Sequence, residues 1–201
     1  MARRNEHSYE QIKAMVLQAA EATLVEDGLA ALNLRTVAAD IGYTVGSVYM
    51  VFTNRADLLL HINTRTLDAI AATFLAIPLA EQKKPIDALA LAYLEYASQN
   101  FNRWRIIFDS PLPLGSKTAE GYQDKLNSLF SPLENQLAQL APTTTKAQQK
   151  RAAWALGCSI HGICIMSLKS PPDPTAIKTT QETLLLMIEH FMQGWLVPSG
   201  A

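Results

Sequence analysis

The chain has 201 residues, of which 49% are hydrophobic, so it can bury the core of one large domain or two small ones. No run of about 18 apolar residues occurs and no apolar signal core follows Arg3 and Arg4, which excludes a membrane-spanning helix and predicts a cytoplasmic protein. The formal net charge of −1 excludes a broadly basic surface, so any nucleic-acid-binding surface has to be local. Glycine and proline mostly separate periodic segments, which favours an all-α fold.

The first predicted helix begins at a capping box formed by Ser8 and Gln11 and ends near Gly28. Apolar residues recur within it at the spacing of one helix face. They are Ile12, Met15, Val16, Ala19, Ala20 and Leu24. We expect this stripe to cover the next two helices and to form a three-helix core with them.

Residues 33–55 contain two short apolar periodic runs on either side of Gly42. Asn33 and Thr44 are suited to cap the two runs, and Gly42 can adopt the left-handed conformation that ends the first run. A short helix, a tight turn and a second short helix make a helix-turn-helix pattern, in which the second helix enters the major groove of DNA. Spacing alone leaves an ordinary helical hairpin as the alternative.

A long amphipathic helix is predicted to follow the cap residue Asn54 and to run from Arg55 to about Ala76. No flexible linker interrupts it. We therefore expect the boundary between a DNA-binding domain of residues 1–62 and a C-terminal domain of residues 63–201 to lie inside this helix, so that motion could pass along it.

The remaining chain is predicted to be helical as well. An aromatic-rich segment, residues 101–108, is followed by a loop that extends to Gly115. Longer helices are expected over residues 85–100, 118–140, 146–169 and 178–196. Pro132 lies inside the second of these helices, where it should kink or break it.

The segment from Ile12 to Ile62 resembles the DNA-binding domain of the TetR (tetracycline-repressor-like) transcriptional regulators. The matching residues are Ala19-Ala20, Gly28, Val37-Ala38, Ile41-Gly42, Gly46-Ser47-Val48-Tyr49, Phe52, Asn54-Arg55 and Leu58-Leu59. Met50-Val51 departs from the family, which often has aromatic or histidine residues there, and Arg55 replaces a frequent lysine but keeps its charge. The resemblance implies an N-terminal DNA-binding domain and a C-terminal domain for ligand binding and dimerisation.

The segment from Tyr93 to Phe108 and the pair His161-Gly162 resemble one C-terminal subclass of this family. That subclass is named for a tryptophan–histidine–glycine signature, whose tryptophan falls near Gly157. In this chain Trp154 lies one turn earlier. The subclass is therefore a finer hypothesis than membership of the family.

The resemblance also implies which residues bind double-stranded DNA. Residues of the second short helix and its cap face the major groove, Arg35 can reach a guanine edge, and Tyr49 and Arg55 can bind phosphates beside a helix N-terminus. The DNA-binding candidates are Arg35, Thr44, Val45, Gly46, Ser47, Tyr49, Met50, Asn54 and Arg55. Ser47 fits a capping role equally well.

A ligand pocket is expected between helices of the C-terminal domain, where such sites are mostly apolar. The candidates are Phe74, Tyr93, Tyr96, Phe101, Trp104, Phe108, Phe130, Trp154, Cys158 and His161. Each of them can instead be a core residue. Their shared chemistry favours a small apolar or aromatic effector, and because the histidines and cysteines match no metal spacing we expect no metal or other cofactor.

The last two long helices carry more apolar surface than one subunit needs. This surplus predicts a homodimer in which these helices form a four-helix bundle across a twofold axis. The interface candidates are Ile165, Leu184, Ile188, Phe191 and Trp195. The alternative is that both stripes are internal core.

Together with these patterns, the resemblance implies a repressor that a small, mostly apolar effector releases from a palindromic operator, and not an enzyme. A helical scaffold with a vestigial helix-turn-helix is one alternative, because five basic residues stand against seven acidic ones through Leu60. A helical enzyme that uses Cys158 and His161 is another, although no third catalytic group lies near them in the sequence.

Overall fold

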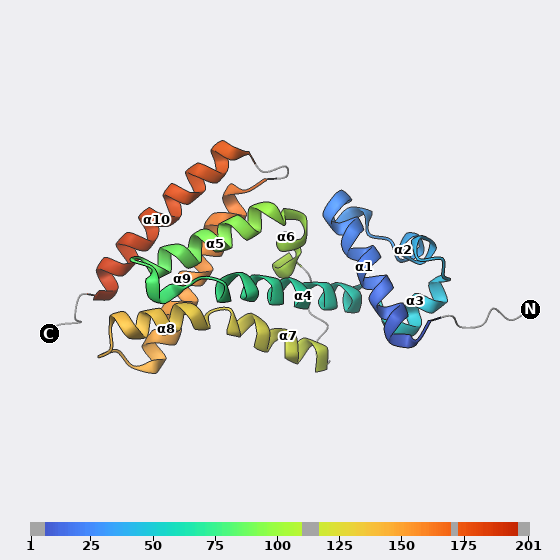
Figure 1. Ribbon diagram of the computed structural model, residues 1–201, viewed down its shortest axis with the longest axis horizontal. Helices are drawn as coiled ribbons and strands as arrows, with labels where there is room; N and C mark the ends of the chain where they lie inside the picture. Colours follow the sequence, from blue (N-terminus) through green and yellow to red (C-terminus); the bar gives the residue numbers. More distant parts are fainter. Residues whose placement is uncertain (1–6, 110–116, 170–172, 197–201) are drawn as a thin grey trace, which may run out of the picture. The chain divides into compact units, whose positions relative to one another are not determined.

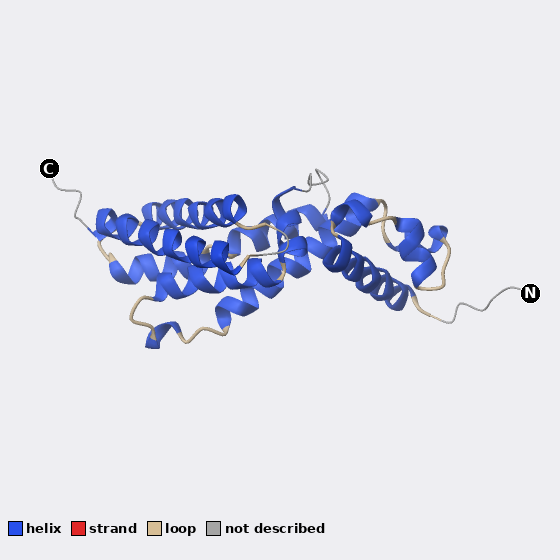
Figure 2. Cartoon of the chain, turned by 90° about the horizontal axis from the view of Figure 1, so that it is seen from above, coloured by secondary structure: helices blue, strands red, loops and turns tan. Residues whose placement is uncertain are grey.

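The computed structural model describes residues 7–109, 117–169 and 173–196 (Figure 1). In these ranges all regular secondary structure is helical, which confirms the predicted all-α fold (Figure 2). The elements are α1 (Tyr9–Asp27), η1 (Leu29–Ala31), α2 (Leu34–Asp40), α3 (Val45–Val51), α4 (Arg55–Leu75), η2 (Leu79–Glu81), α5 (Pro85–Gln99), α6 (Phe101–Asp109), α7 (Lys117–Ser128), α8 (Ser131–Leu140), α9 (Lys146–Ser167) and α10 (Pro174–Leu196).

The chain divides into two compact units, and the division falls inside α4. The first unit comprises Met1–Thr66 and Asn102–Tyr122, and the second comprises Leu67–Phe101 and Gln123–Ala201. The first unit thus holds most of α6 and the start of α7 in addition to the helix-turn-helix. The assignment of DNA binding to residues 1–62 and of ligand binding to residues 63–201 stays a prediction.

The predicted helix ends are confirmed in the first unit. Ser8 and Gln11 form a capping box at the start of α1, and the Asn33 and Thr44 side chains accept backbone hydrogen bonds at the starts of α2 and α3. Gly42 ends the turn after α2 with a φ of 73°, in the left-handed region that favours glycine. These local signals fix where the short helices begin and end.

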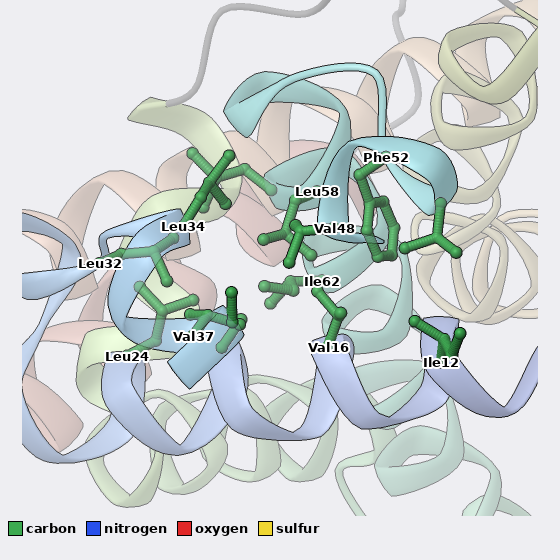
Figure 3. Close-up of a cluster of buried hydrophobic side chains, with 14 of the residues drawn as sticks. Ile12, Val16, Leu24, Leu32, Leu34, Val37, Val48, Phe52, Leu58 and Ile62 are labelled. Carbon is green, nitrogen blue, oxygen red and sulfur yellow. The ribbon is translucent and has the colours of Figure 1, made fainter. Parts of the chain in front are cut away.

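One hydrophobic cluster joins α1, α2, α3 and the start of α4, and Figure 3 shows side chains from these elements pointing into it. Val16 and Leu24 of α1, Val37 of α2 and Val48 of α3 are all fully buried there. Two helices of two turns each are not stable alone in water. Their stability therefore comes from this shared core, as the stripe on the first helix predicts.

Polar contacts attach α6 to the rest of the first unit. Asn63 of α4 donates from Nδ2 to the Ile106 carbonyl oxygen at 3.2 Å, and Asn102 donates from Nδ2 to the Val25 carbonyl oxygen at 3.0 Å. Arg103 lies 3.3 Å from Glu21 of α1, measured from Nη2 to Oε1. The α6 segment is therefore held to α1 and α4 by hydrogen bonds and charge as well as by apolar packing.

The second unit is a helical bundle in which α9 packs against α8 and α10, and α10 also packs against α5. Thr145 and Gln148 form a capping box at the start of α9. Gly157 of α9 is the point of closest approach to Phe130, because a Cβ added to this glycine would lie 2.5 Å from the Phe130 ring. Only a residue without a side chain leaves room for the ring in this position.

The break expected near Pro132 is confirmed, and the last helix differs from its prediction in where it begins. The helix expected over residues 118–140 is broken after Ser128 into α7 and α8, and Pro132 lies in the first turn of α8, where its missing N–H costs nothing. The last helix begins at Pro174, earlier than the expected residue 178, because Asp173 accepts a hydrogen bond from the Thr175 amide and Pro174 suits a first turn.

Candidate functional site

The exposed face of α3 lies opposite its buried face. Val48 and Val51 are buried in the core, whereas Tyr49 is 53% exposed and Met50 is 67% exposed. A helix of this length can bury only one face, so the sequence positions between the two valines necessarily point outward. The structure thus presents a tyrosine hydroxyl and a methionine side chain on the helix that a helix-turn-helix places in the major groove.

The start of α3 is a compact cap. The Thr44 hydroxyl accepts a hydrogen bond from the Ser47 amide at 3.3 Å, and the two hydroxyl oxygens lie 3.1 Å apart. Thr44 and Gly46 are exposed, and Val45 and Ser47 are half-buried. Thr44 is therefore the cap residue and Ser47 lies within the cap, while the contact of Ser47 with DNA stays a prediction.

The exposed arginines Arg35 and Arg55 lie near other helix starts. Asn33 Oδ1 accepts a hydrogen bond from the Arg35 amide at 2.9 Å, so the backbone of Arg35 is fixed while its guanidinium is exposed. Arg55 donates from Nη2 to the Leu29 carbonyl oxygen at 2.7 Å. A guanidinium has five N–H donors, so Arg55 keeps donors for a phosphate while the bond to Leu29 orients it.

Two side chains accept hydrogen bonds from backbone amides at the start of α4. Asn54 Oδ1 accepts a hydrogen bond from the Asp57 amide, and Asp57 Oδ2 accepts one from the Thr53 amide, each at 2.9 Å. Asn54 is exposed beside Arg55. The helix start is thus preformed, which suits an anion-binding position without a conformational change.

Phe52 joins the end of α3 to α1 and α4. Its ring is 1% exposed and meets the His61 ring edge-on at a centroid distance of 5.4 Å, and Lys13 Nζ lies 5.8 Å from its centroid. Burial lowers the pKa of His61 below 6.5, and the charge of Lys13 lowers it further, while Asp57 opposes both effects. His61 is therefore favoured in its neutral form in the folded protein.

The acidic residue Glu21 is neutralised inside the first unit. Its Oε1 lies 3.3 Å from Arg65 Nε and 3.3 Å from Arg103 Nη2, so two positive charges from α4 and α6 surround it. Arg103 also donates from Nε to the Thr66 hydroxyl at 2.8 Å. Glu21 therefore adds little negative potential at the surface. The basic residues Arg3 and Arg4 lie outside the described residues.

Three of the ligand candidates lie together in the second unit. The Phe74 and Tyr93 ring centroids are 6.4 Å apart, and the Tyr93 hydroxyl oxygen lies 2.8 Å from His161 Nδ1. These side chains come from α4, α5 and α9. They form a partly buried aromatic cluster that includes the polar contact between Tyr93 and His161.

The other ligand candidates are dispersed. Tyr96, Phe101 and Trp104 are buried, and Trp104 belongs to the first unit. Phe130 packs against Gly157, whereas Trp154 is 58% exposed and Cys158 is also exposed on the outer face of α9. The side chain of Phe108 lies outside the described ones. For Tyr96, Phe101 and Trp104 the structure favours the core alternative.

A groove of about 760 Å³ lies in the second unit between the end of α4, the following turn, and the junction of α7 with α8. Phe74 is the ligand candidate that lines it, together with apolar residues such as Leu75, Ile77 and Leu129. The polar residues of its lining are Ser128, Ser131, Asn135, Gln136 and Gln139. Its size is in the usual range for a small-molecule site, about 300–1,000 Å³.

Sequence reasoning missed Gln136. It follows Leu133 and precedes Leu137, both buried, so it stands on the inward face of α8. A polar residue on an apolar helix face is the signal that could have identified it. The nearby Asn135 and Gln139 are exposed and carry no such signal.

The dimer candidates need a correction. Leu184 and Ile188 are 0% and 2% exposed in the single chain, so they are core residues and cannot meet a partner without repacking. Ile165, Phe191 and Trp195 are half-buried, and Trp195 donates from Nε1 to the Leu137 carbonyl oxygen at 3.4 Å. The apolar stripe on α10 is therefore largely internal, which is the alternative that the sequence left open.

Two further searches of the described residues gave negative results. No group of three or more histidine, cysteine, aspartate or glutamate side chains that could hold a metal ion occurs among them. Within the same ranges, no helix is both long and apolar enough to cross a membrane.

An exposed helix in a helix-turn-helix, followed by a helical unit with a groove of ligand size, defines a DNA-binding transcriptional regulator with a ligand-binding domain. The family described as "Tetracyclin repressor-like, C-terminal domain" matches residues 86–191, just over half of the chain, and the family described as "Bacterial regulatory proteins, tetR family" matches residues 16–62. The chain belongs to the TetR family of ligand-responsive transcriptional regulators.

Solved structures share this fold over nearly the whole chain. A protein of unknown function from Rhodococcus sp. RHA1 is 19% identical with a TM-score of 0.70, and the match covers 96% of this chain and 98% of that one. A TetR-family regulator from Bordetella parapertussis 12822 is 15% identical with a TM-score of 0.63, covering 90% and 96%. The multidrug binding protein EbrR, complexed with imidazole, is 21% identical with a TM-score of 0.60, covering 94% and 96%. No curated protein matches the chain.

Proposed function

We propose that this regulator is a homodimeric repressor that binds a palindromic operator through α3 and is released when a small, mostly apolar effector occupies the groove beside α4. The observation that carries the proposal is α4 itself. It is one unbroken helix from Arg55 to Leu75, and its end lines the groove with Phe74 and Leu75. Its start carries Arg55, which we propose to bind a phosphate. An effector that displaces Phe74 would act on the same helix that carries Arg55.

Operator recognition is assigned to the exposed residues of the helix-turn-helix. Tyr49 and Arg55 are proposed to bind phosphates, and Met50 to meet base edges, with Arg35 reaching a neighbouring guanine. Among the described residues the Tyr49 hydroxyl has no hydrogen-bond partner, so it is available for a phosphate oxygen. The remaining groove-facing residues, Thr44 to Ser47, are proposed to pack closely against the DNA.

Dimerisation is assigned to the exposed apolar stripe of α9. Trp154, Cys158 and Ile165 share one helix face, and Trp154 is 58% exposed in the single chain. A palindromic operator needs two recognition helices related by a twofold axis, about 34–36 Å apart or a multiple of it. Light scattering should show monomers for Trp154→Glu and dimers for Leu186→Glu, whose residue is equally exposed on α10. A dimeric Trp154→Glu variant would place the interface elsewhere.

The enzyme alternative gains no support. Desolvation raises the pKa of the Cys158 thiol, although the residue is exposed overall, so little reactive thiolate forms near neutral pH. His161 Nδ1 already lies 2.8 Å from the Tyr93 hydroxyl oxygen.

The subclass with the tryptophan–histidine–glycine signature stays a hypothesis, because the position of Trp154 departs from it. The multidrug binding of the neighbour EbrR is consistent with a small-molecule effector here.

The proposal is tested by selecting bound sequences from random DNA and then titrating the selected operator with and without a groove ligand. We expect a palindromic sequence whose affinity falls by about 5–150-fold when ligand saturates the protein, the usual range of allosteric coupling. By linkage, the operator should weaken ligand binding by the same factor. Equal ligand affinities with and without operator would show that the groove and α3 are uncoupled.

A further inference from the structure

Gln136 differs from every other buried polar residue in the described part of the chain. Five such residues are buried there: Asn63, Thr66, Gln136, Gln149 and Thr180. Four of them form hydrogen bonds through their side chains, and Gln136 forms none with any described residue. The Gln136 amide therefore keeps free hydrogen-bonding capacity for a molecule that binds from outside.

The comparison with Gln149 is close, because both glutamines are 8% exposed and both belong to the second unit. Gln149 donates from Nε2 to the Thr144 carbonyl oxygen at 3.0 Å and to the Thr144 hydroxyl at 3.2 Å. Gln136 instead lines the groove of about 760 Å³ between α4 and α8. Its amide atoms are not among the sealed, unpartnered polar atoms of the chain, so they are accessible from the groove.

The groove is uncharged. Its lining contains hydroxyl, amide and apolar side chains and no aspartate, glutamate, lysine, arginine or histidine. A charged ligand would lose its hydration there and gain no opposite charge in return. An amide side chain, by contrast, offers a donor and an acceptor side by side, which match a carboxamide, lactam or imide edge on a ligand.

We propose that the groove binds an uncharged, mostly apolar molecule that presents a carboxamide-type donor–acceptor edge to Gln136. Phe74, Leu75 and Leu129 contact its apolar body, and the Gln136 amide fixes its orientation. Only the view that this molecule acts as the effector of the regulator rests on the proposed function. The binding site itself is independent of any DNA.

The test uses the purified full-length protein and two sets of probes that differ only in their head group. One set is biphenyl carboxamide, biphenyl carboxylate and methylbiphenyl, and the other is the n-octyl amide and the matching carboxylate. We expect both amides to bind at least about tenfold more tightly than the corresponding carboxylates, the factor expected for one buried hydrogen bond and an avoided charge burial. Equal or tighter binding of the carboxylates, or no binding of either set, would overturn the proposal.

Variants separate a ligand-binding role of Gln136 from a structural one. Gln136→Leu should weaken amide binding by about tenfold or more and leave methylbiphenyl binding unchanged. The control is Gln139→Leu, at an exposed position of the same helix, which should weaken amide binding less. Without ligand, Gln136→Leu should raise Tm because it removes an unpartnered amide, whereas Gln149→Leu should lower it because it breaks two hydrogen bonds. A lower Tm for Gln136→Leu would mean that the amide stabilises the fold, and the proposal would fail.

Operator binding by the same variants keeps this inference separate from the proposed function. Gln136→Leu should bind the selected operator as the unmodified chain does when no probe is present. If no DNA is selected but the amide preference holds, the repressor proposal fails and the groove assignment stands. If operator is bound but neither probe set binds, the groove assignment fails and the DNA-binding function stands.

Discussion

The two packing units differ in whether their unpartnered buried polar groups are accessible from outside. In the first unit, Asn63 and Thr66 each donate a side-chain hydrogen bond, and Glu21 is held between Arg65 and Arg103. The polar atoms that lack a hydrogen-bond partner among the described residues there, Glu21 Oε1 and Asn63 Oδ1, are sealed from solvent. In the second unit, Gln136 is buried beside a groove with its amide unpartnered. The unpartnered buried polar atoms of the first unit are therefore closed off from any ligand, while the second unit has an accessible unpartnered amide at Gln136 that we propose to be used by a ligand.

The difference matches the tasks that we propose for the two units. A DNA-reading surface works best when its shape is fixed before binding, because ordering side chains on contact costs affinity. A ligand site needs unsatisfied polar groups, because these turn binding of the correct molecule into a gain in stability. Experiments on each unit can break or sharpen this contrast.

The largest expected effect follows from removing the ring that joins α3 to α1 and α4. Phe52→Ala should destabilise the first unit by about 3–5 kcal/mol, the usual cost of a large cavity in a closed core, and should abolish operator binding. Denaturant unfolding measures the change. Met50→Ala is the matched control on α3, since its 67% exposed side chain should alter stability by less than about 0.5 kcal/mol. Similar stability losses in both variants would contradict the burial of Phe52 in a closed core.

The first unit is also where the sequence was most informative, and the reason is physical. Asn33, Thr44 and the capping box at Ser8 act within a few residues of the backbone groups that they satisfy, and Gly42 is marked by its own turn. Such signals can be read from a window of the chain. The exposure of Tyr49 follows from the same local periodicity.

The groove could not be predicted in the same way, because it exists only where α4, α7 and α8 come together. The aromatic candidates were chosen by residue type, yet Phe74 is the one that lines the groove. An apolar stripe also does not reveal what covers it, so Leu184 and Ile188 were assigned to a partner although their own chain buries them. Residue type and periodicity fix which face is apolar, and tertiary packing decides what meets it.

A smaller effect is expected from the DNA-facing surface of the first unit. Tyr49→Phe should weaken operator binding by about tenfold, uniformly over operator sequences, because a lost phosphate contact carries no base specificity. Arg55→Ala should also weaken binding and lower the dependence of log affinity on log salt by about one. Fluorescence anisotropy at several salt concentrations measures both changes. Unchanged affinity in both variants would remove these two residues from the interface.

In the second unit, two glycines of α9 test how tightly the bundle is packed. Gly157→Ala should destabilise by about 1–2 kcal/mol, because its Cβ would lie 2.5 Å from the Phe130 ring and overpacking outweighs the gain in helix propensity. Gly162→Ala should stabilise by about 0.5–1 kcal/mol, since nothing lies within 4 Å of its added Cβ. Both are measured by denaturant unfolding at one protein concentration. A stabilising Gly157→Ala would show that Phe130 does not approach α9 as closely as the structure has it.

The smallest expected effect is a pH dependence of the first unit that comes from His61. Burial and Lys13 hold the pKa of His61 below its usual 6.5, so the unfolded chain takes up a proton more readily than the folded one as the pH falls. The stability contributed by neutral His61 is fully present above pH 6.5 and is lost as the pH falls through the lower pKa of the folded protein. Because the side chain is 26% exposed, solvent screening keeps this loss well below the cost of Phe52→Ala.

The loss is measured as the difference in unfolding free energy between about pH 7.5 and pH 5.5, which bracket the titration of histidine. His61→Gln should flatten this dependence. The sign of the change in unfolding free energy on acidification is the decisive observation. Asp57, 3.8 Å from His61 Nε2, raises the pKa of His61 and so opposes the effect of burial. If the unmodified chain gained stability on acidification relative to His61→Gln, the Asp57 pair would dominate over burial. The environment of Phe52 would then be less closed to water than the rest of the first unit.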